Sequence, residues 1–105
     1  KIMLLMVQIT VDLPGDMDPA KVKDIGEAEA SRAIELIQAG NLRKIWRVVG
    51  ARANFSIWET DTLEEFHAAI SSLPMHPYMT VQVTPIIEHP ATRAYEPRVG
   101  PFPTI

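Results

Sequence analysis

The sequence predicts a single α+β domain in which two helices cover one face of a four-stranded antiparallel sheet. Residues 2–11 and 79–87 alternate in hydropathy as strands do. Residues 19–40 and 60–73 carry apolar stripes at helical spacing, and residues 43–58 have the pattern of a hairpin. A chain of 105 residues is long enough to bury one hydrophobic core.

The first strand and the first helix follow from local signals. Along residues 2–11, apolar side chains alternate with mixed ones, which predicts a strand with one buried face. Asp18 followed by Pro19 is typical of a helix N-cap and first turn. The helix is expected to end at Gly40, a residue type that commonly terminates helices.

A hairpin is predicted from residues 43–49 and 52–58, with a two-residue turn at Gly50 and Ala51. We expect its more apolar face to lie under the helices. That face consists of Trp46, Val48, Ala53, Phe55 and Ile57. The opposite face carries the polar residues Arg47, Arg52, Asn54 and Ser56.

The second helix is predicted at residues 60–73, followed by a proline-broken turn and a fourth strand at 79–87. Its expected N-cap is Thr60 or Thr62, and its expected core residues are Leu63, Phe66 and Ile70. This order of elements is the ferredoxin-like βαββαβ arrangement. We expect a domain over residues 1–90 and a loose or neighbour-wrapped, proline-rich tail over residues 91–105.

Composition excludes several classes of function. A net charge of −3 without a basic tract argues against a nucleic-acid partner. The absence of cysteine excludes disulfides, a thiolate nucleophile and cysteine-ligated metals, and the three histidines lack metal-ligand spacing, so no metal is expected. The apolar start is too short to span a membrane, so we expect a cytoplasmic protein.

Glu29 is the first candidate for chemistry. It lies near the middle of the apolar stripe of the first helix, which consists of Val22, Ile25, Ala33 and Leu36. A carboxylate aimed at the core must be paired, hydrogen-bonded or raised in pKa, as general bases and acids often are. The alternatives are a structural ion pair and a position at a pocket rim.

The hairpin arginines are the second candidate. Arg47, Arg52 and Asn54 share one face of the predicted hairpin and have the donors to hold a carboxylate. In the predicted register they lie across the sheet from Glu29, so one subunit does not bring them together unless a bulge or longer turn changes the register. The alternative is a set of salt bridges between subunits, because the open sheet face is expected to dimerise.

Three stretches of the chain resemble the muconolactone Δ-isomerase family: MLLMVQITVDLPGDMDP, QAGNLRKIWRVVGARANFSIWE and SLPMHPYMTVQVTPIIEHP. The resemblance covers residues 3–92. It implies a cofactor-free 1,3 proton shift that moves a ring double bond in an unsaturated lactone bearing a carboxymethyl group, within the β-ketoadipate route for aromatic compounds. It also implies an assembly of ten subunits built from dimers.

The resemblance assigns roles to residues as well. Glu29 aligns with a family glutamate, and five residues fall on family motif positions: Trp46, Arg47, Asn54, Pro77 and Tyr78. This chain departs from the family pattern at four positions: Ala30 replaces a lysine, Lys44 and Met6 each replace a histidine, and Arg52 replaces a tyrosine. His76 also replaces a family aromatic residue.

These observations lead to a set of expected roles. Glu29 is the expected base, and Arg47 or Arg52 is expected to bind the substrate carboxylate. Lys44, Asn54 or a backbone N–H is expected to stabilise enolate charge. Trp46, His76 and Tyr78 complete the expected substrate-binding set. The alternative functions are a cofactor-free oxygenase or other enzyme of the dimeric α/β-barrel type, and a non-catalytic oligomeric binding protein.

Overall fold

The computed structural model describes residues 2–94 and has the predicted elements in the predicted order. Its helices and strands are β1 (Met3–Val11), α1 (Pro19–Gln38), β2 (Leu42–Arg47), β3 (Ala53–Thr60), α2 (Leu63–Ser71) and β4 (Met79–Ile86). A 3-10 turn, η1 (His76–Tyr78), precedes β4, and a short helix, α3 (Pro90–Ala94), follows it.

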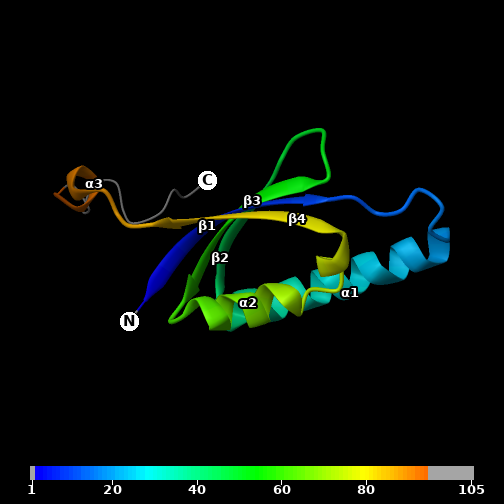
Figure 1. Cartoon of the computed structure of the whole chain (residues 1–105), viewed down its shortest axis with the longest axis horizontal. Helices are drawn as coiled ribbons and strands as arrows, with labels where there is room; N and C mark the ends of the chain where they lie inside the picture. Colours follow the sequence, from blue (N-terminus) through cyan, green and yellow to red (C-terminus); the bar gives the residue numbers. More distant parts are fainter. Residues whose placement is uncertain (1, 95–105) are drawn as a thin grey trace.

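The four strands form one antiparallel sheet in the order β2-β3-β1-β4. Figure 1 shows α1 and α2 together on one side of this sheet, and no other helix or strand of residues 2–94 covers the opposite side, which is called the open face below. The predicted ferredoxin-like α+β fold is therefore confirmed.

The core lies between β1, β3 and the two helices. Leu5, Val7 and Ile9 alternate along β1 and are at most 2% exposed, as the hydropathy pattern predicted. Trp58 of β3 is 1% exposed and packs edge-on against Phe66 of α2, with ring centroids 5.3 Å apart. These contacts fix which face of the sheet the helices cover.

Both helix caps follow the sequence signals. The Asp18 carboxylate accepts a hydrogen bond from the Ala20 N–H, and the Thr62 hydroxyl accepts one from the Glu65 N–H. The predicted burial of Leu63 is wrong, because this side chain is 52% exposed. It is the first residue of α2 and precedes the turns that contact the core.

The hairpin loop is longer than predicted. The Val48 N–H donates to the Ala53 carbonyl oxygen at 2.9 Å, which leaves residues 49–52 as a four-residue loop. Gly50 in this loop has φ of +81°, a backbone conformation that glycine adopts without steric cost. The predicted two-residue turn at Gly50 and Ala51 is therefore wrong, although the pairing of Arg47 with Asn54 is as predicted.

The prediction of which hairpin face lies under the helices is also wrong. β3 pairs with β1 so that Asn54 lies opposite Ile9 and Trp58 lies opposite Leu5, both on the helix-covered face. Arg47 pairs with Asn54 and joins that face, whereas the apolar set Trp46, Val48, Ala53, Phe55 and Ile57 lies on the open face. The buried Trp58 decides the outcome, because side chains two and four residues away along a strand share its face.

A β-bulge lets β2 keep this orientation along its length. Leu42 pairs with Trp58 and Lys44 pairs with Ile57, so one extra residue of β2 is inserted between them. The insertion places Leu42 in the core and still leaves Ile45 and Arg47 on the helix-covered face. Without the bulge, Leu42 and Ile45 would face opposite sides.

The segment after β4 differs from the predicted extended tail. Residues 90–94 form the helix α3, which Figure 1 shows well away from α1 and α2. The rest of the predicted tail, residues 95–105, lies outside the described residues.

Candidate active site

A cavity of about 650 Å³ lies between α1 and the helix-covered face of the sheet. Glu29 lines it from the helix, and Arg47, Arg52 and Asn54 line it from the hairpin. The other residues that line the cavity are mostly apolar. They come from α1, from each of the four strands and from the turn before η1. One subunit thus brings together the base candidate and the arginines, contrary to the predicted separation across the sheet.

Glu29 is held by one hydrogen bond from the backbone. Its Oε1 accepts from the Met75 N–H at 2.8 Å, while Oε2 accepts no hydrogen bond from a described residue. Burial raises the pKa of the Glu29 carboxyl above its ordinary value of 4.5, and the Met75 N–H opposes that rise. One oxygen is therefore fixed, and the other remains available to take a proton from a ligand.

The turn between α2 and β4 positions this N–H. The His76 N–H donates to the Leu73 carbonyl and the Tyr78 N–H donates to the Met75 carbonyl, each at 2.9 Å. Pro74 and Pro77 further restrict the backbone. Sequence reasoning missed the Met75 N–H as a site group, and the proline-bounded turn was the signal that pointed to a rigid segment there.

The two hairpin arginines sit at one end of the cavity. The Arg52 carbonyl oxygen accepts from the Val11 N–H at 2.9 Å, which fixes the loop against β1. Neither the Arg47 nor the Arg52 guanidinium is bonded to another described residue, whereas Arg32 pairs with Glu35 and Arg43 pairs with Glu59. Two arginines with unused donors at a cavity mouth are suited to an anionic group.

Asn54 lies between these arginines and the middle of the sheet. Its Oδ1 is buried without a hydrogen-bond partner among the described residues. Buried amide groups are normally bonded, so an unpaired one that lines a cavity has room for a partner supplied by water, by a ligand or by a moving side chain. The neighbouring Ser56 hydroxyl is already used, since it donates to the Val7 carbonyl and accepts from the Trp58 indole N–H.

The structure does not bring all of the predicted site residues together. Lys44 and Trp46 lie on the open face of the sheet and do not line the cavity. His76 and Tyr78 belong to η1 next to Met75, and they too are outside the lining. The indole Nε1 of Trp46 is buried with no partner in the described part of the chain.

Within residues 2–94, no three carboxylate or histidine side chains gather closely enough to hold a metal ion. Among the described helices, none is both long and apolar enough to cross a bilayer.

Comparison with known proteins gives consistent results. The family described as "Muconolactone delta-isomerase" matches residues 3–92. The muconolactone Delta-isomerase of Cupriavidus pinatubonensis is 40% identical over 86% of this chain and 98% of its own length. That of Pseudomonas putida is 37% identical over 86% of this chain and 94% of its own length.

A solved structure agrees with the sequence matches. A crystal structure of muconolactone isomerase superposes with a TM-score of 0.80 at 38% identity, covering 85% of this chain and 93% of that chain. Sequence and fold are thus shared over most of both chains. The chain belongs to the muconolactone delta-isomerase family.

Proposed function

We propose that this chain isomerises muconolactone to the enol-lactone by a proton shift in which Glu29 is the only base. The isomerase activity is that of the family to which the chain belongs. The roles of individual residues rest on one observation: a partly buried carboxylate and two unpaired arginines line the same cavity. This combination distinguishes the proposal from an oxygenase, which has no need of a carboxylate clamp.

The chemistry requires a base that is close to the ring and partly desolvated. The ring proton on the carbon that bears the carboxymethyl arm is acidic, because its loss gives a dienolate with charge on the lactone carbonyl oxygen. The Glu29 carboxylate takes this proton on Oε2 and returns it to the ring carbon next to the carbonyl. A raised pKa of Glu29 makes the carboxylate a stronger base than a solvated glutamate.

The remaining polar groups have separate tasks in this proposal. Arg47 and Arg52 bind the carboxylate of the substrate at the mouth of the cavity. Asn54 donates its amide N–H to the charge that develops on the lactone oxygen. Lys44, predicted as an alternative for that role, is directed to the other face of the sheet.

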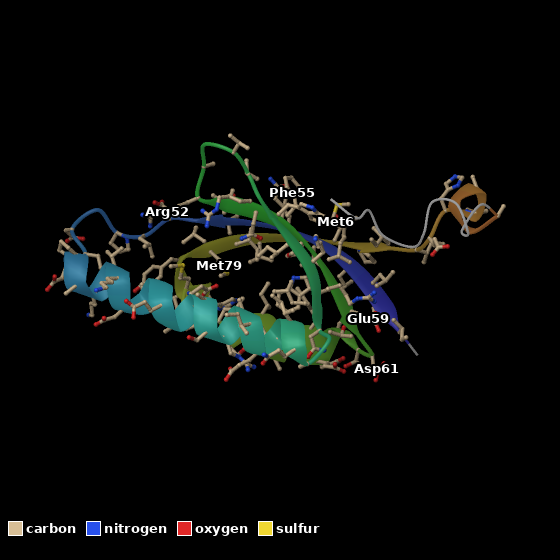
Figure 2. All side chains as sticks on the ribbon, turned by 180° about the vertical axis from the view of Figure 1, so that it is seen from behind. Met6, Arg52, Phe55, Glu59, Asp61 and Met79 are labelled. Carbon is tan, nitrogen blue, oxygen red and sulfur yellow. The ribbon has the colours of Figure 1, made fainter. Side chains whose placement is uncertain are left out.

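We also propose a homo-oligomer built from dimers that pair through the open face. Figure 2 labels Met6 and Phe55, which lie on the open face and are 41% and 40% exposed. The unpaired indole Nε1 of Trp46 lies on the same face and needs an acceptor. Light scattering on the purified protein tests this proposal, and a monomer at micromolar concentration would contradict it.

The first experiment follows muconolactone by NMR in D₂O with the purified protein and with Glu29→Gln. We expect conversion, with solvent deuterium entering the ring carbon next to the carbonyl only in those turnovers in which the Glu29 carboxyl exchanges its proton with the solvent before returning it. The variant is expected to lower kcat by about 10²–10⁴-fold, the range for loss of a general base.

Glu27→Gln is the matched control, because Glu27 is an exposed residue of the same helix. It is expected to keep full activity. Full activity in Glu29→Gln would exclude Glu29 as the base, and no conversion by the intact protein would exclude muconolactone as the substrate.

A further inference from the structure

The cavity is polar at one end and apolar at the other. Arg52 and Trp58 lie near opposite ends of β3, and the strand from Ala53 to Trp58 spans roughly 16 Å. In Figure 2, Arg52 and Met79 lie toward one end of the sheet, and Glu59, next to Trp58, lies toward the other. The guanidinium groups therefore occupy only one end of a long cavity.

Glu29 stands between the two ends. α1 runs from Val22, at the arginine end, toward Leu36. The Leu36 carbonyl oxygen accepts a hydrogen bond from the Asn41 N–H, and β2 begins at the next residue, which pairs with Trp58. Glu29 and Ala33 are one helical turn apart, which is roughly 6 Å along the helix axis. A ligand held by the arginines and reached by Glu29 therefore points its far side toward Ala33 and Trp58.

That far end offers no free polar side chain among the described residues. Its lining consists of Ala33, Leu42, Ile45, Trp58 and Leu73, together with Ser56. The Ser56 hydroxyl and the Trp58 indole N–H are bonded to each other, and the same hydroxyl is bonded to the Val7 carbonyl. Only an apolar group gains from transfer into this end of the cavity.

Most of the α1 side chains that line the cavity are also small. Gly26, Ala30 and Ala33 are the α1 residues that accompany Val22 and Glu29 in the lining. A Cβ atom added at Gly26 meets no other atom within 4 Å, so the space in front of the helix is open. A cavity of about 650 Å³ is in the range that encloses drug-sized ligands, whereas unsubstituted muconolactone is a far smaller molecule.

We propose that the preferred substrate is a muconolactone carrying an alkyl group on the ring carbon next to the carbonyl, across the ring from the carboxymethyl arm. This inference rests on the proposed function and deepens it by naming the substrate class. With the carboxylate on Arg47 and Arg52 and the ring beside Glu29, the alkyl group occupies the space lined by Ala33, Ile45 and Trp58. The reaction is unchanged, because the ring carbon that carries the alkyl group still receives one proton.

The test compares kcat/KM for muconolactone and its methyl, ethyl and propyl homologues substituted at that carbon. We expect an increase of about fourfold for each added carbon, the value for transfer of one methylene group out of water. Calorimetry with the corresponding saturated lactones, which do not isomerise, is expected to give the same order in Kd. A preference for the unsubstituted lactone in both measurements would overturn the inference.

Two variants of α1 locate the effect. Ala33→Leu fills the apolar end and is expected to remove the advantage of the propyl homologue. Ala28→Leu adds the same side chain at an exposed position and is expected to keep that advantage. An unchanged propyl advantage in Ala33→Leu would contradict the proposed place of the alkyl group.

The outcomes separate this inference from the proposed function. If all lactones react but chain length has no effect, the inference fails and the isomerase with its Glu29 base stands. If none reacts while the saturated lactones bind more tightly with chain length, the proposed function fails and the pocket preference stands.

Discussion

On the two faces of the sheet, the hairpin places its residues in the reverse of the way that hydropathy predicts, with polar side chains under the helices and apolar ones on the open face. The helix-covered face holds Arg47 and Asn54 around a cavity, whereas the open face holds Trp46 and Phe55. Under the proposed function, a ligand in the cavity explains the polar groups under the helices, and pairing with another subunit explains the apolar groups on the open face. The comparison teaches that hydropathy alone does not decide which face of this hairpin lies under the helices.

The largest contrast between the faces is expected in stability. Trp58→Ala removes a side chain that is 1% exposed and is expected to lower the free energy of unfolding by about 3–5 kcal/mol. Phe55→Ala, on the open face and 40% exposed before truncation, is expected to cost about 1 kcal/mol or less. Urea titration at a protein concentration low enough to dissociate oligomers measures both.

Equal losses in the two variants would show that the open face is as much a core as the covered one. The Phe55→Ala variant is instead expected to weaken self-association, which light scattering detects. This result would tie the exposed aromatic residue to a subunit contact.

The second contrast concerns two cations on opposite faces of β2. Arg47→Ala is expected to raise KM for the lactone carboxylate by about 10–100-fold, because charge-assisted hydrogen bonds contribute roughly 1.5–3 kcal/mol. Lys44→Gln is expected to change KM by no more than about twofold, as surface substitutions do. Steady-state kinetics on both variants measures the difference, and a larger effect from Lys44 would place substrate on the open face.

The pH dependence separates Glu29 from the exposed carboxylates. Because burial raises the pKa of Glu29, kcat/KM is expected to increase with pH around a midpoint above 4.5. The folded chain holds this proton to a higher pH than the unfolded chain does. The Glu29 contribution to stability is therefore full below pH 4.5 and is lost as the pH rises through the raised pKa.

Glu29→Gln is the variant that tests this linkage, since it cannot ionise. Urea titrations between pH 4 and pH 8 are expected to show a smaller fall in the free energy of unfolding for this variant than for the native sequence. An equal fall in the two proteins would mean that Glu29 ionises at its ordinary pKa and that burial does not tune it.

The smallest effects are expected at two glycines. Gly50→Ala forces φ of +81° on a residue with a Cβ atom and is expected to destabilise the hairpin by about 1–2 kcal/mol. Gly26→Ala lies within α1 with open space around the new atom and is expected to stabilise by about 0.5–1 kcal/mol. Thermal melts of the pair measure both signs, and a gain in Gly50→Ala would show that the loop does not need this conformation.

Much of the fold could be predicted from local patterns. The alternation along β1, the Asp18 and Thr62 caps and the order of elements were confirmed, because each depends on neighbours in the sequence. The position of Glu29 on the inner stripe of α1 was predicted for the same reason. Helical periodicity fixes a direction within a single element.

The orientation of the hairpin could not be predicted in this way. Inverting the hairpin exchanges its two faces without changing any local signal, so the choice depends on contacts with β1 and α2. Trp58 supplied those contacts through Leu5 and Phe66, and the bulge after Leu42 allowed β2 to follow. The hydrogen bond from the Met75 N–H to Glu29 could not be predicted from the sequence either, since the two residues are 46 positions apart along the chain.

The sequence by itself determined the fold class, the family and the candidate base. Only the tertiary structure decided that Glu29, Arg47 and Arg52 share one cavity and that Lys44 and Trp46 do not. The physical reason is the two-residue period of a strand, which makes the burial of a single large side chain determine the face of every other residue.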